Sequence, residues 1–305
     1  MRSLGRLFLE ALLVWFALVS IVFLLCRVLA GDPAELVLGD LATPAEKVAL
    51  RAARGWDQPL PVQYVRFLLS SLMGSFGESV RRPGVLAESR ILAMLPHTSS
   101  LALVSVGVAA VLGIGSAILS RVRALGRVRF ALEPLRVLFS TLPLLAVAPV
   151  AVFIFSVKLR LVPFADPHSL LSFLFAAFLL ALPLSAHVGR IAHAALKEVD
   201  RATFVLVARA KGASETRVLA VHALRSIVGV MLVVIGTQLA SLLGGAIVLE
   251  KLFDRPGLGT LTIEAYFTRD LPVLEGALVA SGTLFVAVQT CAQWATFFLD
   301  PRTRR

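Results

Sequence analysis

The chain has 305 residues, of which 58% are hydrophobic and only 16% are charged. These fractions lie far outside those of soluble domains, so the composition excludes a pair of ordinary soluble domains and indicates a protein embedded in a lipid bilayer. The net charge of +11 would suit a nucleic-acid-binding protein. Such a protein needs a polar basic face with aromatic side chains for stacking, and only 8% of the residues are aromatic. We therefore expect no nucleic-acid partner.

Apolar runs of about 20 residues, long enough for a helix to cross a bilayer, occur six times. They predict spans at 7–29, 98–120, 137–157, 169–189, 227–249 and 276–299. The first run follows a short basic start, Arg2 and Arg6, so a cleaved signal peptide is the alternative to a retained helix. Its length and the lack of a clear small-residue cleavage site favour the retained helix.

Six spans place both termini on the same side of the membrane, and the positive charges indicate which side that is. One face receives most of the basic residues: Arg2, Arg6, Arg121, Arg123, Arg127, Arg129, the basic residues of 190–225, Arg302, Arg304 and Arg305. Positively charged loops stay in the cytoplasm during insertion, so we expect a multi-pass protein of the cytoplasmic (inner) membrane with both termini cytoplasmic.

The predicted organisation has four parts. They are a first transmembrane helix at 1–30, an extracytoplasmic loop region at 31–93, a five-helix domain at 94–299 and a cytoplasmic tail at 300–305. The loop region should carry short helices, because Thr43 and Glu46 have the capping-box spacing with Pro44 at the first helical position. Residues 60–71 also have an amphipathic pattern.

Special residues within the spans predict irregular helices and close packing. Prolines that could bend a helix are Pro143, Pro149 and Pro183, and glycines that permit close helix contact are Gly113, Gly115, Gly244 and Gly245. Polar side chains at membrane depth should face protein or water, and the candidates are Gln238, Gln289 and Gln293. We single out Gln238 as a pathway residue, because its span directly follows the coupling segment described next; ordinary packing is the alternative.

Residues 196–225, which we name the coupling segment, are mixed apolar and basic. Apolar residues recur at helical spacing from Leu196 to Ala210, and Gly212 follows where a helix commonly ends in a left-handed residue. Ser214 can cap a second helix that continues into the fifth span. The predicted shape is a helix, a tight glycine turn and a helix; a solvated basic loop is the alternative.

Several motifs along the chain resemble one family. The run 204–214, Phe-Val-Leu-Val-Ala-Arg-Ala-Lys-Gly-Ala-Ser, is similar to the cytoplasmic signature loop of ATP-binding-cassette (ABC) importer permeases, in the dipeptide/oligopeptide/nickel branch. Further matches are Gly31-Asp32-Pro33-Ala34, Asp57-Gln58-Pro59-Leu60-Pro61, Pro256-Gly257-Leu258-Gly259, Arg269-Asp270-Leu271-Pro272-Val273 and Asp300-Pro301-Arg302. Leu206 departs from the pattern, because many such importers have a glutamate six residues before the loop glycine.

The resemblance implies an all-α integral membrane protein with six transmembrane helices, in the type-I ABC importer permease fold with a cytoplasmic coupling helix. That helix would dock on a separate ATPase through Phe204, Val205 and Ala208, with Arg209 and Lys211 at its rim. The full set of implied coupling residues is Phe204, Val205, Ala208, Arg209, Ala210, Lys211, Gly212, Ala213 and Ser214.

The same resemblance implies the partners and the cargo. The partners would be a second homologous permease subunit, two ABC ATPases, an extracytoplasmic solute-binding protein and membrane lipid. The cargo would be di- or oligopeptides, with nickel or other small peptide-like solutes as further candidates. ATP and Mg²⁺ would be bound by the partner subunits, because the chain has no G-x-x-x-x-G-K-[ST] loop.

An enzymatic function finds no support in the side-chain inventory. The five histidines form no H-E-x-x-H motif, and no nucleophile and base are paired, so we expect no catalytic residues and no metal site in this chain. A membrane-embedded hydrolase would need such a pair. A stand-alone channel or secondary carrier is the other alternative; it would show an inverted repeat or an intramembrane charge, and the sequence indicates neither.

Overall fold

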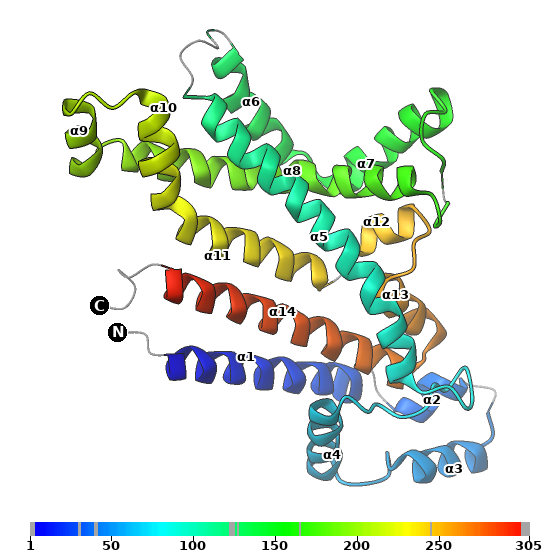
Figure 1. Ribbon diagram of the computed structural model, residues 1–305. Helices are drawn as coiled ribbons and strands as arrows, with labels where there is room; N and C mark the ends of the chain where they lie inside the picture. Colours follow the sequence, from blue (N-terminus) through cyan, green and yellow to red (C-terminus); the bar gives the residue numbers. More distant parts are fainter. Residues whose placement is uncertain are drawn as a thin grey trace.

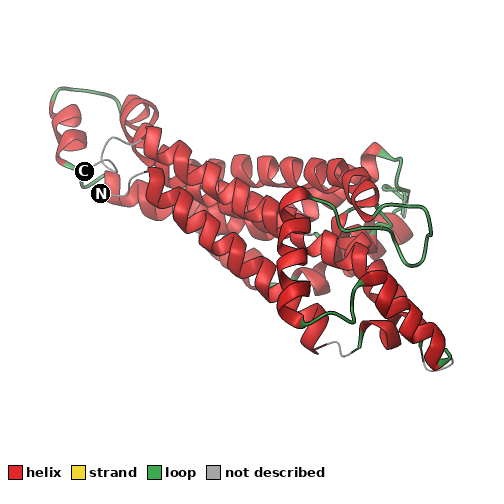
Figure 2. Ribbon diagram, turned by 90° about the horizontal axis from the view of Figure 1, so that it is seen from below, coloured by secondary structure: helices red, strands yellow, loops and turns green. Residues whose placement is uncertain are grey.

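The computed structural model of the chain describes residues 4–29, 32–39, 42–121, 126, 128–164, 166–244 and 246–299. Among these residues there are helices and loops but no strand (Figure 2). The α-helices are α1 (Leu4–Leu24), α2 (Pro33–Leu38), α3 (Pro44–Arg54), α4 (Leu60–Met73), α5 (Ala87–Leu119), α6 (Val128–Thr141), α7 (Leu144–Val152), α8 (Leu170–Val199), α9 (Thr203–Ala210), α10 (Glu215–Arg217), α11 (Leu224–Leu243), α12 (Ile247–Leu252), α13 (Leu258–Thr268) and α14 (Leu271–Leu299). Three π-helical segments extend them, η1 (Leu25–Leu29), η3 (Phe153–Lys158) and η4 (Val218–Ala223).

The long helices form one bundle, and its two ends differ (Figure 1). The start of α1, the end of α14 and the short helices α9 and α10 lie at one end, whereas α2 and α3 lie at the other (Figure 1). Five described helices are long and apolar enough to cross a membrane: residues Leu4–Arg27, α5, α8, α11 and α14. The helical nature of the predicted first, second, fourth and sixth spans is therefore confirmed.

The predicted third span, 137–157, is not one straight helix. Its residues belong to two helices, Phe130–Thr141 and Leu144–Lys158, that meet at an angle of 100°. Pro143 lies at the break and precedes the first residue of α7. Because proline lacks an N–H and disfavours helical geometry in the residue before it, a helix cannot run through this point undisturbed. The bent pair counts as a sixth span only if both halves together cross the membrane.

The predicted fifth span, 227–249, extends beyond the end of the observed helix. Helix α11 ends at Leu243, and the following residues form the separate helix α12. Glu250 on α12 is 1% exposed and accepts hydrogen bonds from the hydroxyl of Thr98 on α5, at 2.7 Å, and from the backbone N–H of Thr260, at 2.9 Å. Glu250 thereby satisfies one of the backbone N–H groups at the beginning of α13 that lack helical partners.

Close packing of α5 against α8 forms the centre of the bundle. A methyl group added at Gly113 on α5 would lie 2.9 Å from the side chain of Val188 on α8, so the prediction of close contact is confirmed at Gly113. It is wrong at Gly115, where such a methyl group would meet nothing within 4 Å, and at Gly244, where it would meet only its own helix end. Gly245 lies outside the described residues.

The loop region carries α2, α3 and α4, as the sequence predicted. Thr43 and Glu46 form the predicted capping box with Pro44 in the first turn of α3. Helix α4 covers the predicted amphipathic segment and packs on α1, with Phe67 in one hydrophobic cluster with Val19. Helix α5 already begins at Ala87, so its first turns precede residue 94, the boundary predicted for the five-helix domain. The predicted tail at 300–305 lies outside the described residues.

Candidate functional site

The coupling segment folds into short helices that project from one end of the bundle (Figures 1 and 2). Helix α9 ends at Ala210, and Gly212 adopts a φ of 81°. The hydroxyl of Ser214 then accepts a hydrogen bond from the N–H of Arg217 and caps α10. The predicted geometry of a helix, a glycine turn and a capped helix that leads into the next span is therefore present.

The predicted length of the first helix in this pair is wrong. The sequence predicted a continuous helix over 196–210, but α8 ends at Val199 and α9 begins at Thr203. Ala202 between them has extended backbone. The interruption lets α9 fold back against η4, and Val205 thereby becomes completely buried. Burial of an apolar side chain against the bundle offsets the loss of helical hydrogen bonds at the break.

Exposure of the α9 side chains identifies the surface that a partner can reach. Phe204, Leu206 and Val207 are exposed, by 38%, 53% and 46%. Val205 was predicted to contact the ATPase, and this is wrong because its side chain is buried within the chain itself. The remaining predicted residues lie around the same turn: Ala208, Arg209 and Ala213 are partly buried, and Ala210, Lys211, Gly212 and Ser214 are exposed. Sequence spacing missed Leu206 and Val207 because both faces of α9 are apolar.

Ion pairs connect α9 to the rest of the bundle. Arg121, just after α5, pairs with Asp200 in the turn that follows α8. Arg209 Nη2 lies 3.5 Å from Asp200 Oδ1, and Arg209 Nε lies 3.0 Å from Glu215 Oε1 on α10. Arg209 therefore contacts its own chain while its side chain stays 35% exposed, and its place at the rim of the contact stays a prediction. Burial and the nearby Arg209 guanidinium lower the pKa of Arg121 from its ordinary value, and Glu215 opposes this shift.

This charged cluster, Arg121, Asp200, Arg209 and Glu215, was missed in the sequence. Arg121 and Asp200 are far apart along the chain, so only the packing of α5 against α8 brings them together. The proximity of Arg209 and Glu215 had a weak local signal, because an acidic residue in the first turn of a helix and a basic residue in the last turn of the preceding one face each other across a tight turn.

The polar residues of the spans give one contact between helices. The hydroxyl of Thr237 on α11 lies 3.1 Å from Gln289 Oε1 on α14. Gln238, the predicted pathway residue, is next to Thr237 and is partly buried. Its role in transport stays a prediction.

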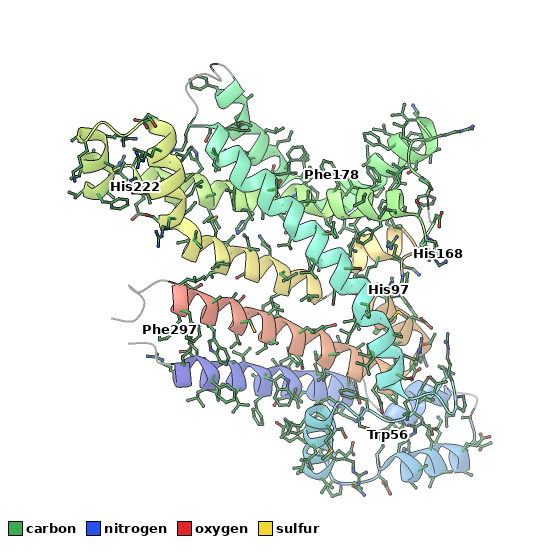
Figure 3. All side chains as sticks on the ribbon, in the orientation of Figure 1. Trp56, His97, His168, Phe178, His222 and Phe297 are labelled. Atoms are coloured by element: carbon green, nitrogen blue, oxygen red, sulfur yellow. The ribbon has the colours of Figure 1, made fainter. Side chains whose placement is uncertain are left out.

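No group of three His, Cys, Asp or Glu side chains that could hold a metal ion occurs in the described part of the chain. The labelled histidines lie on separate elements: His222 is at the end with α9, away from His97 and His168 (Figure 3). The two cysteines, Cys26 and Cys291, are free.

Family comparisons match nearly the whole chain. A family model described as "Binding-protein-dependent transport system inner membrane component" matches residues 109–305, and the model for the N-terminal part of such membrane components matches residues 1–83. A putative peptide permease protein of Brucella suis is 31% identical over 300 residues, which cover 94% of each chain. A putative peptide transport system permease protein of Brucella abortus is 33% identical and covers 97% of this chain and 96% of its own. The oligopeptide transport system permease protein AppB of Bacillus subtilis is 28% identical and covers 92% of each chain.

A solved structure has the same fold. A chain of the MetNI methionine ABC transporter, in an inward-facing conformation, superposes with a TM-score of 0.59 at 16% sequence identity, covering 69% of this chain and 96% of that chain. The predicted all-α, type-I permease fold is thereby confirmed. The chain therefore belongs to the family of inner membrane components of binding-protein-dependent transport systems.

Proposed function

We propose that this chain is the membrane-spanning permease subunit of an ATP-driven importer of short peptides, and that it forms half of the translocation pathway. One observation carries the proposal: α9, Gly212 and α10 project from one end of an apolar bundle and present exposed apolar side chains there. An apolar face on a short helix suits insertion into a groove of a partner protein. The partner at this end is an ATPase, as the family of binding-protein-dependent transporters implies.

The cargo is proposed from the relatives. The two Brucella proteins carry names that refer to peptides, and AppB is named for oligopeptide transport. Because these relatives align with nearly all of this chain, di- and oligopeptides are the cargo that we propose. Nickel or other small peptide-like solutes are further candidates within the same branch.

The contact with the ATPase would be made by Phe204, Leu206 and Val207, with Lys211 beside them. The exposed position of Leu206 suggests a physical consequence of its departure from the family pattern. Where a glutamate would make a charged contact, leucine adds apolar area, which is removed from water when the partner binds. We propose that the contact in this subunit is mainly apolar and is therefore less sensitive to salt than a charged contact.

The charged cluster would transmit movement of α9 to the spans. Arg121 follows α5, Asp200 follows α8, and Arg209 joins Asp200 to Glu215 on α10. When two ATPases close on ATP and displace α9, these ion pairs oblige α5 and α8 to move with it. The two transmembrane halves would then exchange inward- and outward-facing states by rigid-body motion.

The remaining assignments complete the assembly. The partners would be a second related permease subunit, two ATPases and an extracytoplasmic solute-binding protein. ATP and Mg²⁺ would be held by the ATPases, so this chain is a transporter subunit and not an enzyme. Both termini and α9 would lie in the cytoplasm, as the distribution of positive charge favours. Gln238 on α11 would line the pathway.

The test is an affinity purification of the tagged chain from detergent-solubilised native membranes. We expect to recover a second six-span protein and an ATPase whose activity survives purification. The complex, reconstituted in vesicles with the binding protein, should accumulate a labelled dipeptide only when ATP is present. Recovery of the stable chain alone, with peptide movement independent of ATP, would contradict the proposal and favour a stand-alone channel or secondary carrier.

A further inference from the structure

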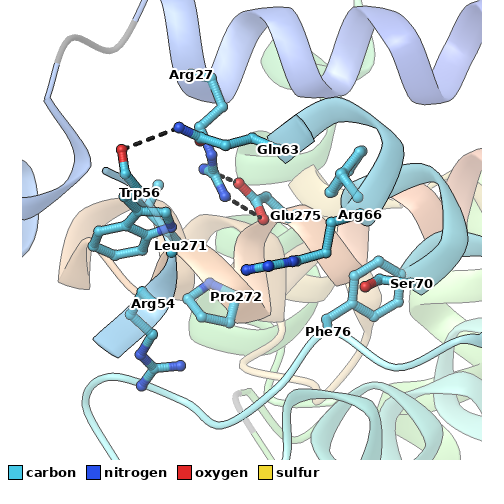
Figure 4. A pocket seen from close by; sticks show the side chains of 12 residues that line it. Arg27, Arg54, Trp56, Gln63, Arg66, Ser70, Phe76, Leu271, Pro272 and Glu275 are labelled. Carbon is cyan, nitrogen blue, oxygen red and sulfur yellow. Dashed lines mark hydrogen bonds and ion pairs between the residues drawn. The ribbon is translucent and has the colours of Figure 1, made fainter. Parts of the chain in front are cut away.

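A charged cavity lies at the end of the bundle opposite α9, between α4 and the first turn of α14 (Figure 4). Its volume is about 130 Å³, which is enough for several water molecules or a phosphate group. Among the residues that line it, three are arginines, Arg27, Arg54 and Arg66, and only Glu275 is acidic. The lining therefore carries a surplus of positive charge.

Two of these arginines have no acidic partner among the described residues; Arg54 is partly buried and Arg66 is exposed. Glu275 is already paired with Arg27, whose Nη2 lies 3.3 Å from Glu275 Oε2. Arg54 Nη1 donates to the backbone oxygen of Glu78 at 3.0 Å, and Arg66 Nη2 donates to the side-chain oxygen of Gln58 at 3.0 Å. Both acceptors are uncharged amide oxygens.

One buried donor of a residue that lines the cavity has no partner in the described part of the chain. Arg27 Nε is buried and has no hydrogen-bond acceptor among the described residues. A buried N–H without an acceptor costs free energy, and an anionic oxygen is the acceptor that a guanidinium binds most strongly. A negatively charged oxygen-bearing group therefore suits the chemistry of this lining.

An apolar groove adjoins the cavity along α4. It is lined by Pro61, Val62, Val65, Leu69 and Arg66, and Arg66 also lines the cavity. Among them, Val62, Val65 and Leu69 lie on one face of α4 and are each about half exposed. Phe67, on another face of α4, is buried against α1. Arg66 therefore stands between a cationic cavity and an open apolar surface.

The position of α4 relates this surface to the membrane. The apolar helix that includes α1 ends at Arg27, and α4 packs on α1 near this end and runs across its direction (Figure 1). An apolar face beside a cationic side chain, on a helix that lies across the end of a membrane span, is typical of a helix in the headgroup region. Ile21 and Leu24 on the same end of α1 are also about half exposed, so the apolar surface of α4 continues that of a membrane span.

We propose that the cavity and the groove together bind one anionic phospholipid. Its phosphate lies between Arg54 and Arg66 and within reach of Arg27 Nε, and one acyl chain follows Val62, Val65 and Leu69. This function goes beyond transport: the lipid fastens α4 to the membrane surface and neutralises the surplus charge between α4 and α14.

Native mass spectrometry of the full chain tests the proposal. The chain is purified in detergent, mixed with equal amounts of phosphatidylglycerol and phosphatidylcholine, and the bound lipid is counted. We expect a preference for phosphatidylglycerol, because each arginine near an anionic headgroup contributes about fivefold in binding. The double variant Arg54→Gln/Arg66→Gln should lose about 25-fold. Lys251→Gln, which removes an exposed cation of α12, is the matched control and should bind as the original chain does.

Further arms separate a lipid from a soluble anion. Val65→Ser/Leu69→Ser keeps the arginines, and it should weaken phosphatidylglycerol binding several-fold without changing the binding of inorganic phosphate. Competition in the original chain needs no variant: millimolar inorganic phosphate should not displace the lipid. Displacement by phosphate, together with no effect of the serine variant, would overturn the lipid proposal in favour of a soluble-anion site.

Two other results would overturn the proposal altogether. One is equal retention of phosphatidylglycerol by the double arginine variant, provided that its melting temperature matches that of the original chain. The other is binding by the isolated chain but not by the complex purified with its partners, because another subunit would then cover the site. If the affinity purification recovers no partner subunits but the chain still prefers phosphatidylglycerol, the proposed transport function fails and the proposed lipid site stands.

Discussion

Gly212 offers a direct test of the coupling turn, because substitution there changes only the backbone. Its φ of 81° lies in the left-handed region, and a methyl group added to it would meet no atom within 4 Å. Any loss caused by a substitution therefore comes from the cost of that backbone conformation and not from a steric clash within the chain. Asparagine tolerates this region, alanine does less well, and β-branched valine is a strong outlier there.

The magnitude follows from the cost of a left-handed residue, about 1–2 kcal/mol for side chains other than glycine. A cost of about 1 kcal/mol reduces the equilibrium constant for forming the turn about fivefold, and about 2 kcal/mol reduces it about thirtyfold. We expect Gly212→Asn to be close to the original, Gly212→Ala to lose about fivefold and Gly212→Val about thirtyfold or more. Membrane insertion should be unchanged, because the spans are untouched.

The assay is ATP-dependent uptake of a labelled dipeptide by vesicles that contain the reconstituted complex, normalised to the amount of inserted chain. Gly84→Val is a matched control, because Gly84 has a φ of 80° and equally open surroundings but lies in the loop before α5. The purified complex that contains the Gly84→Val chain should retain its ATPase subunits. Normal uptake by a well-inserted Gly212→Val chain would refute the coupling assignment. Equal loss in the asparagine and valine variants would show that the partner contacts the glycine itself and that φ is not the cause.

Three further predictions follow from burial and charge. Phe204→Ala should lower the yield of co-purified ATPase at an unchanged melting temperature. Val205→Ala leaves a cavity at a buried position and should lower the folding stability, measured by melting in detergent, by about 2 kcal/mol. The reverse pattern would contradict the exposures of the two side chains. Gly257→Ala should destabilise the chain by about 1–3 kcal/mol, because the new methyl group would overlap the carboxylate of Glu250, and an unchanged melting temperature would count against this packing. The Arg51 hydrogen bond lowers the pKa of Asp32, so its contribution, under about 1 kcal/mol, is present above the ordinary carboxylate pKa and is lost as the pH falls through the lowered value. The hydrogen-exchange protection factors of α2 and α3, corrected for the intrinsic exchange rate at each pH, should fall in acid, and Asp32→Asn should remove that fall.

Local features of the fold could be predicted because their causes lie within a few residues of each other. The capping box of Thr43 and Glu46 needs only a spacing of three, and the turn at Gly212 needs only a residue that tolerates a positive φ between two helical patterns. The apolar spans likewise follow from composition over about 20 residues. The resemblance of the 204–214 run to a family signature loop likewise identifies the coupling segment from the sequence alone.

Boundaries and orientations were less predictable, because several arrangements have the same local pattern. Pro143 predicted a bend in the third span, but the angle of 100° depends on what the two halves pack against. Val205 and Leu206 are both apolar and adjacent on α9, and periodicity could not tell which of them faces the bundle. The end of α11 at Leu243 did have a signal, because Gly244 caps the helix, but we interpreted Gly244 and Gly245 as sites of close helix packing.

Composition, helical periodicity, caps and the glycine turn were determined by the sequence itself, since they depend on interactions within about four residues or on the transfer of a whole segment into lipid. Only the tertiary structure decided which polar and charged side chains meet. Glu250 reaches Thr98, Arg121 reaches Asp200, and Glu275 reaches Arg27 across long separations along the chain. A buried charge is stable only where another element supplies its partner, and no local pattern records which element that is.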